Sequence, residues 1–262
     1  MATTDLLGWL DGELATLDDR TEALATGAVP DDELGDYRAT TATLAEKAAA
    51  GLVKVRDDPD TARRWFDTAM ELHAGAADAG TDPVDERYYA LRAATLAGSK
   101  QAVPGLARGL KRAVDRADLK ELDERAALHR DYYLALAAGA LGDAGEMERA
   151  GERFAGTVNR LANAGFFATT EHEERALYGG RSEAIEGILV RDPATVARGI
   201  EGVLAHHDGS AGGPRTDLPC REATFLTTVA TAAGLGEHLP DHDAVADSLV
   251  DATALPDGPR PE

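Results

Sequence analysis

Apolar residues recur along most of this chain with the spacing of an α-helix. Leu7, Leu10, Leu14 and Leu17 are separated by three or four residues, which places their side chains on one helix face. Later segments repeat this spacing, with Asp, Glu and Arg between the apolar positions, as is typical of amphipathic helices that cover a core. Convincing strand alternation does not occur. The pattern therefore predicts an all-α fold.

Start and stop signals divide the chain into about eleven helices. An aspartate followed by proline offers an N-cap acceptor and a residue suited to the first turn, and this pair occurs at Asp58-Pro59, Asp82-Pro83 and Asp192-Pro193. The expected helices lie near 4–25, 30–56, 59–78, 83–97, 100–116, 119–140, 144–163, 171–189, 193–207, 219–234 and 242–252. Pro104-Gly105 falls inside the fifth, so that helix is either kinked there or begins later.

The middle of the chain contains a faint internal repeat. A shift of 44 residues superposes Tyr89 on Tyr133 and Gly98 on Gly142, and a third unit follows at an offset of 49. Each unit consists of two predicted helices joined by a short glycine-containing turn, which indicates stacked antiparallel helix hairpins in an irregular α-solenoid-like arrangement. These units resemble tetratricopeptide hairpins, although that family has a shorter period of about 34 residues.

We expect residues 1–252 to form a single all-helical domain, with residues 1–80 as a separate helical subdomain in an alternative division. Residues 253–262 are rich in proline and should form a disordered tail. The segment 207–215 should be a flexible connection between two late helices. It contains glycines but lacks the Gly-Lys-Ser/Thr ending of a phosphate-binding P-loop.

The charge of the chain bears on its environment and its partners. The net charge is -20, and five Lys accompany 22 Arg among the 27 basic residues. Such a field repels nucleic acid, which makes that class of partner unexpected. Acidic excess with few lysines is typical of proteins that stay soluble in concentrated salt, where charges are screened within about 3 Å. A GC-rich genome is an alternative explanation of the same composition.

Other features point to a cytoplasmic protein. The N-terminus carries acidic residues before any apolar stretch, unlike a secretory signal, and no stretch is apolar for the roughly 18 residues of a membrane span. Cys220 is the only cysteine, which excludes an intrachain disulfide and a cysteine-rich zinc site.

Candidate chemistry concentrates in the last quarter of the chain. Side chains able to bind zinc there are His206, His207, Asp208, His238, Asp241, His242 and Asp243. Since no His-Glu-x-x-His motif occurs and terminal histidines suit the helix dipole, we expect no metal and no cofactor. Cys220 could serve as a thiol nucleophile activated by a helix N-terminus, or could simply be buried.

Tyrosines occur as adjacent pairs at equivalent positions of two predicted hairpins. In Tyr88-Tyr89 and in Tyr132-Tyr133 we expect one ring to point inward and the other towards the helix edge. His129 shares the apolar face of its helix with Tyr133, as a hydrogen-bonded core histidine would. Exposed rings at these positions could anchor a partner, and ordinary packing is the alternative.

The last third of the chain has a distinctive layout. Its successive markers are Asp192-Pro193, Gly199-Ile200, His206-His207, Arg221-Glu222 and Gly234-Leu235-Gly236, which frame two helices and an acidic turn. Over about residues 175–252 this layout resembles the immunity-49 family of helical toxin-immunity proteins. The resemblance implies a non-catalytic protein that neutralises a partner toxin by binding it.

We therefore expect a helical protein-binding protein, of the toxin-neutralising kind if the resemblance holds. Its partner-binding residues would be His206, His207, Arg221 and Glu222, which make polar contacts and are not catalytic. The alternative is a tetratricopeptide-like scaffold in a larger assembly, which predicts a groove with ordered aromatic and arginine side chains. A third class is a metal- or thiol-dependent enzyme that uses the late His, Asp and Cys cluster.

Overall fold

The structure is a computed structural model that describes residues 3–117, 124–168, 172–209, 218–239 and 242–255. It is 81% helical, and the described residues contain no strand, which confirms the predicted all-α fold. The α-helices are α1 (Thr3–Ala25), α2 (Leu34–Gly51), α3 (Pro59–Asp78), α4 (Pro83–Ala97), α5 (Val103–Arg116), α6 (Glu124–Ala140), α7 (Ala144–Asn163), α8 (His172–Val190), α9 (Pro193–Gly209) and α10 (Arg221–Ala232).

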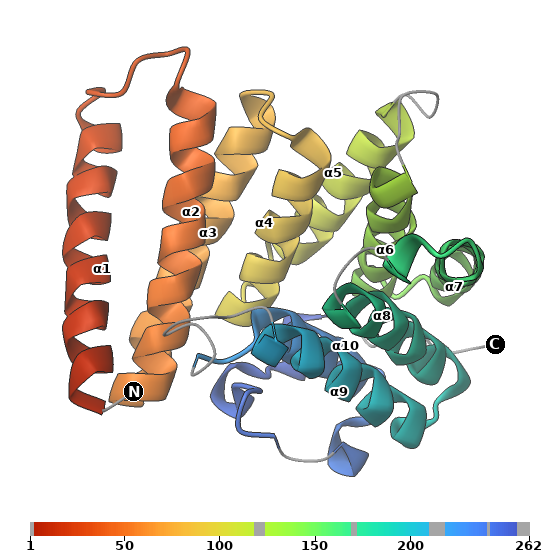
Figure 1. Ribbon diagram of the computed structural model, residues 1–262. Coiled ribbons are helices and arrows are strands. Elements are labelled where there is room, and N and C mark those ends of the chain that lie inside the picture. The colour runs from red at the N-terminus through yellow and green to blue at the C-terminus, as the bar shows by residue number, and fades with distance from the viewer. Residues whose placement is uncertain (1–2, 118–123, 169–171, 210–217, 240–241, 256–262) are drawn as a thin grey trace.

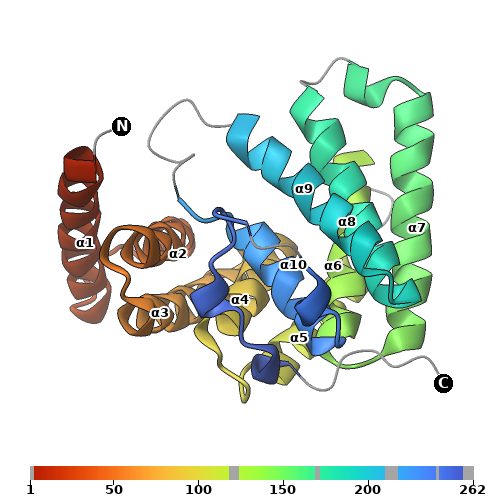
Figure 2. The same ribbon diagram turned by 90° about the horizontal axis from the view of Figure 1, so that it is seen from below.

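Consecutive helices pack side by side, and α10 then returns to the middle of the chain. In Figure 1 the helices α1 to α5 run up and down the page, whereas α8, α9 and α10 cross beneath them. The view from below shows α10 between α4 and α9, both of which it contacts (Figure 2). Buried apolar residues from Leu10 to Leu255 form one continuous core cluster. This return of α10 brings residues far apart in sequence to one place.

The predicted start signals hold for two helices and differ for a third. Asp58 caps α3 by accepting a hydrogen bond from the Thr61 amide at 3.0 Å, and Asp192 accepts one from the Ala194 amide at 3.1 Å before α9. Asp82 precedes Pro83 but adopts a left-handed φ of 33° and makes no capping hydrogen bond. The fifth helix begins at Val103, so Pro104 lies in its first turn and causes no kink.

The repeat identified in the sequence corresponds to two hairpins, α4–α5 and α6–α7. Gly98 and Gly142 end the first helix of each hairpin, with φ values of 78° and 72° that favour glycine. Tyr133 is fully packed in the core, whereas its equivalent Tyr89 is partly exposed. The two hairpins therefore have similar glycine turns, but they differ in the burial of the equivalent tyrosines, which lie at the candidate site.

The C-terminal part of the chain departs from the predicted boundaries. The helix expected at 242–252 is replaced by two short 3-10 turns, Asp247–Leu249 and Ala252–Ala254, which pack against α3 and α10 respectively. The predicted disordered tail starts too early, since Ala254 and Leu255 are buried in the core. Residues 210–217, which include most of the predicted flexible connection, and residues 256–262 lie outside the described residues.

Helices α8 and α9 pack with their backbones in direct contact. A Cβ atom added to Gly180 would lie 2.5 Å from the Gly199 carbonyl oxygen, and one added to Gly199 would lie 2.4 Å from the Ala184 nitrogen. Both distances are far below van der Waals contact, so only glycine permits this approach. This close contact of α8 with α9 fixes the positions of the other side chains of α8.

The substitution Gly180→Ala should destabilise the protein by about 2–3 kcal/mol, because the backbones of α8 and α9 would have to separate. A Cβ atom added to the neighbouring Gly179 would meet no atom within 4 Å, so Gly179→Ala should be neutral or stabilising by up to about 1 kcal/mol. Urea unfolding of both variants gives the comparison. Equal effects of the two substitutions would contradict the close packing.

Candidate functional site

A pocket of about 310 Å³ lies where α4, α6, α8, α9 and the start of α10 meet. Arg92 and Tyr89 enter it from α4, His129 and Tyr133 from α6, and Leu177 and Arg181 from α8. Val203, His206 and His207 come from α9, and Cys220, Arg221 and Glu222 from the start of α10. The pocket thus collects side chains from helices that are far apart in sequence, through the return of α10.

Glu222 is the centre of a buried polar network beneath this pocket. Its carboxylate accepts hydrogen bonds from the Tyr88 hydroxyl at 2.7 Å and from the Tyr132 hydroxyl. Arg181 Nη2 lies 3.0 Å from Oε1, and Arg92 Nη1 lies 3.3 Å from Oε2. Four groups from α4, α6 and α8 therefore meet one carboxylate on α10, which is 8% exposed.

A second buried carboxylate, Glu46 of α2, accepts hydrogen bonds from Arg92 and Arg221. Arg92 Nη2 donates to both of its oxygens, at 3.0 and 2.8 Å, and Arg221 Nη1 donates to Oε2. Glu46 is 1% exposed. Arg92 thus bridges Glu46 and Glu222, and the network spans α2, α4, α6, α8 and α10.

The network fixes the ionisation of its members. Burial alone would raise the pKa of Glu222, but the charges of Arg181 and Arg92 and the hydrogen bonds from Tyr132 and Tyr88 lower it to about 2. Burial, and then the charge of Glu222, raise the pKa of Tyr88 and of Tyr132 well above the usual value. The carboxylate is therefore ionised at neutral pH, and both phenols remain neutral donors.

Aromatic rings form one side of the pocket. Tyr88 and Tyr133 stack with ring centroids 3.9 Å apart and planes inclined by 13°. Tyr133 is 1% exposed, so the prediction that one ring of each pair faces the helix edge is wrong for Tyr132-Tyr133. The reason is that the stack on Tyr88 and the contact of Tyr132 with Phe154 bury both rings. His129 Nε2 lies 2.9 Å from the Tyr178 hydroxyl, at the edge of the pocket.

The structure brings the four nominated residues, His206, His207, Arg221 and Glu222, to the same pocket. His207 Nε2 lies 3.0 Å from the Leu218 carbonyl oxygen, which ties the end of α9 to the chain before α10. Glu222 is committed to its four donors, so its place is beneath the pocket as an anchor for the arginines. Arg221 is more accessible than Glu222, with a side chain that is 27% exposed.

The sequence interpretation missed Arg92, Arg181 and Glu46. In the sequence, each is one charged residue within a predicted amphipathic helix. Glu46 offered a usable signal, because it lies among Ala42, Ala45 and Ala49 in a segment that is otherwise apolar on that face. The partners of these charges are at least 41 residues away in sequence, and no local pattern identifies them.

Cys220 is buried and unsuited to the nucleophilic role considered above. It precedes α10 as the N-cap residue without a side-chain cap hydrogen bond. Burial raises the pKa of its thiol, and the nearby backbone amides of Ala223 and Glu222 only partly oppose this. The helix N-terminus therefore does not bring the pKa of this thiol below its usual value.

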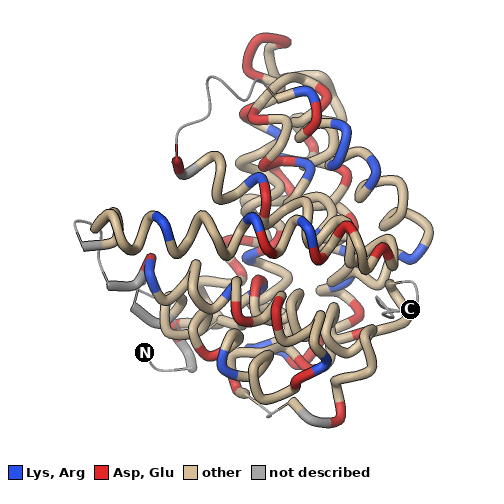
Figure 3. Tube along the Cα trace, turned by 90° about the vertical axis from the view of Figure 1, so that its right-hand side faces the viewer, with Lys and Arg blue, Asp and Glu red and all other residues tan. Residues whose placement is uncertain are grey.

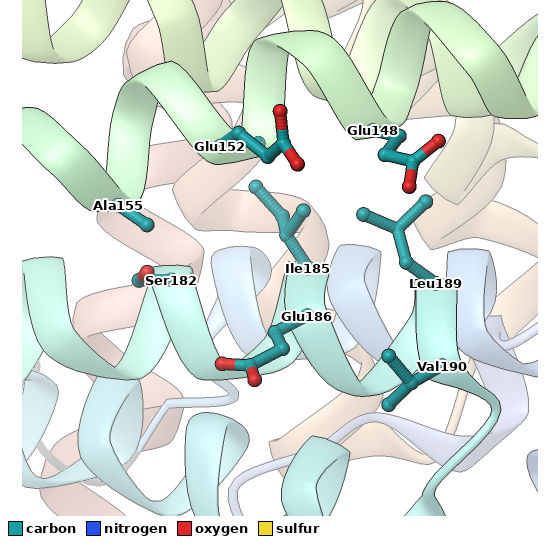
Figure 4. A pocket seen from close by; sticks show the side chains of 9 residues that line it. Glu148, Glu152, Ala155, Ser182, Ile185, Glu186, Leu189 and Val190 are labelled. Atoms are coloured by element: carbon teal, nitrogen blue, oxygen red, sulfur yellow. The ribbon is translucent and has the colours of Figure 1, made fainter.

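A second recess lies further along α8, between α7 and α8. Its volume is about 330 Å³. In Figure 4, Ile185 and Leu189 point from α8 towards α7, while Glu148 and Glu152 of α7 stand above them and Glu186 stands beside them. The floor of this recess, which we call the α7–α8 groove, is apolar, and its rim is acidic.

Two findings concern metal ions and membranes. Within the described ranges, no group of three or more His, Cys, Asp or Glu side chains is placed to hold a metal ion. Asp241 of the late His and Asp cluster lies outside the described residues. No helix of the described part is long and apolar enough to cross a membrane.

Comparisons of the chain with protein-family models, with curated proteins and with solved structures find no match. The resemblance to the immunity-49 family therefore stays a prediction. Fold and site together define an all-α protein in which a buried Arg–Glu–Tyr network underlies an arginine-lined pocket.

Replacing Glu222 by Gln should lower the free energy of unfolding at neutral pH by about 3 kcal/mol, because Arg181 loses its carboxylate partner in a buried setting. The folded pKa of about 2 lies below the usual 4.5, so this carboxylate stabilises the fold above pH 4.5 and loses that effect as the pH falls towards 2. The difference between wild type and variant should therefore shrink by about 1 kcal/mol at about pH 3.5. Urea unfolding at the two pH values measures it.

Glu201→Gln provides the control, since Glu201 is exposed on α9. Its effect should stay within about 0.5 kcal/mol at both pH values. A Glu222→Gln variant as stable as this control, or a difference that does not change with pH, would contradict an ionised Glu222 at the centre of the network.

Proposed function

We propose that this protein is a non-catalytic binding protein for another protein, with the α7–α8 groove as its docking surface. The observation that carries the proposal is the exposed apolar side chain of Val190, which continues the apolar floor of this groove at the end of α8. Val190 ends α8 and is 65% exposed, although large apolar side chains gain free energy when they leave water. Leu189 beside it is half-buried, and Ile185 closes the floor.

The rim of the groove indicates the chemistry of the partner. Glu148, Glu152 and Glu186 are exposed, and none has a Lys, Arg or His nitrogen within 4.0 Å among the described residues. An amphipathic helix with an apolar stripe and flanking Lys or Arg would satisfy both floor and rim. We infer a partner segment of that kind.

The identity of the partner divides the proposal in two. If the partner is a toxin, as the resemblance to the immunity-49 family implies, this protein should bind it through one broad surface. A scaffold in a larger assembly would instead offer recesses with ordered aromatic and arginine side chains. The pocket with Tyr89, Tyr133, Arg92 and Arg181 supports the scaffold, whereas the layout of the last third supports the toxin antagonist.

The proposal extends to a cytoplasmic protein with a salt-adapted surface. The net charge of -20 and the preference for Arg over Lys support this setting. Partner binding should accordingly be assayed both in dilute buffer, where the acidic rim contributes, and in about 2 M KCl, where surface charges are screened and apolar contacts remain. A protein that unfolds in this salt while remaining folded in dilute buffer would contradict the salt-adapted part of the proposal.

The substitution Val190→Lys should abolish partner binding, because it removes apolar floor and places a cation opposite a basic segment. Immobilised wild type, Val190→Lys and Leu7→Lys proteins are incubated with lysate of the source cells, and bound proteins are identified by mass spectrometry. Leu7 is the matched control, since it is also a large apolar residue with an exposed side chain, at 39%, and it lies on α1.

The proposal requires one protein that is retained by wild type and by Leu7→Lys and is reduced about tenfold or more by Val190→Lys. Cross-linking should place that protein's contact in a segment with Lys or Arg beside apolar residues. Equal retention by all three proteins, retention of nothing, or an acidic contact segment would contradict the proposed docking surface.

A further inference from the structure

The arginine-lined pocket differs in charge from the rest of the protein. Acidic and basic positions are mixed along the helices on the side seen in Figure 3, and the whole chain carries a charge of -20. The pocket, by contrast, is lined by three arginines, three histidines and a single carboxylate, Glu222. The concentration of basic side chains in one recess of an acidic protein suggests that the recess has a specific role.

The carboxylates near the arginines are already fully used. Glu222 accepts from two tyrosines and two arginines, as described above, and Glu46 accepts from Arg92 and Arg221. Asp85 lies beside His129, with 3.7 Å between its Oδ1 and the His129 Nδ1, and is not paired with any of these arginines. Each of the three guanidinium groups has a carboxylate partner, but three positive charges share two negative ones, so the cluster carries one excess positive charge.

Two of the arginines have donors or charge that the carboxylates do not fully satisfy. Arg92 Nε is buried and has no hydrogen-bond partner, although a buried N–H of this kind normally has one. Arg221 reaches Glu46 through Nη1, and its side chain is 27% exposed at the pocket. Burial, reinforced by the nearby charge of Arg92, lowers the pKa of Arg221, and the charge of Glu46 does not compensate. An anion in the pocket could accept a hydrogen bond from an arginine N–H and would balance the excess positive charge.

The dimensions and walls of the pocket limit what the anion can be. A volume of about 310 Å³ is at the small end of ligand pockets. Guanidinium groups bind carboxylate and phosphate oxygens through paired N–H donors. The rings of Tyr89 and Tyr133 provide an apolar side against which the carbon-bearing part of a ligand can pack.

We propose that this pocket binds an oxyanion, a carboxylate or a phosphate group, with Arg221 at its entrance and Arg92 and Arg181 at its base. Glu46 and Glu222 hold these guanidinium groups in place, and the tyrosines bury the adjoining part of the ligand. The inference rests on the pocket and is independent of the α7–α8 groove, so either proposal can fail alone. The oxyanion can belong to a free small molecule or to a partner chain.

The test is a titration of the purified full-length protein with defined probes at constant ionic strength. The probes are inorganic phosphate, acetate, and a short acetylated peptide with either a free C-terminal carboxylate or an amidated end. Calorimetry should show saturable binding of at least one oxyanion with a Kd of about 1 mM or lower. Preference for the free peptide over the amidated one assigns the oxyanion to a partner chain, and binding of phosphate or acetate alone assigns it to a small molecule.

Variants place the binding in the pocket. Arg221→Gln should weaken binding about tenfold or more, and Arg221→Lys, which keeps the charge without the paired donors, should weaken it less. Arg198→Gln removes an arginine that is 59% exposed on α9 and should leave binding unchanged. In the wild type, the Nε–H resonances of Arg92 and Arg181 should shift in parallel with the calorimetric signal, which tests the proposal even if Arg221→Gln fails to fold.

The proposal is overturned if none of the oxyanions binds saturably, or if those resonances do not move when an oxyanion binds. It is equally overturned if folded Arg221→Gln binds as well as wild type, because the interaction would then be with the general protein surface.

Discussion

The fold depends on the burial of one ionised carboxylate, that of Glu222. Removing a carboxylate from water is unfavourable unless cations and hydrogen-bond donors replace its hydration. Here Tyr88, Tyr132, Arg92 and Arg181 provide that replacement from α4, α6 and α8. The position of α10 is therefore set by charge as well as by apolar packing, since any shift would leave Glu222 or an arginine unpaired in the interior.

Helix α8 connects the two recesses of the molecule. Its close contact with α9, through Gly180 and Gly199, fixes the rotation of α8 about its own axis. With that rotation, Arg181 faces Glu222 and the pocket, whereas Ile185 and Leu189 face the α7–α8 groove. Arg181 and Ile185 are one turn apart on α8, so successive turns of one helix line the arginine-lined pocket and the apolar floor of the groove. A ligand in either recess would contact the same rigid element.

The sequence predicted the local features of this structure and missed the long-range ones. Helix periodicity, the caps at Asp58 and Asp192 and the turns at Gly98 and Gly142 depend on residues within a few positions, so they could be recognised. The nominated His206, His207, Arg221 and Glu222 do lie at one pocket. Arg92, Arg181 and Glu46 escaped notice because a buried charge and an exposed one follow the same pattern on a helix until the partner is known. The short turns near the C-terminus were predicted as a helix for a related reason, as their shape follows from packing against α10 and α3.

The most direct test of this account is the ionisation of Glu222 in the folded protein. Carbon-13 NMR of the glutamate side-chain carboxyl groups, assigned by comparison with Glu222→Gln, follows each titration separately. The account predicts that Glu222 remains ionised at pH 4.5 and titrates with a midpoint of about 2, or only as the protein unfolds in acid. A midpoint at or above 4.5 would show that Arg92 and Arg181 do not outweigh the cost of burial, and would contradict the proposed network.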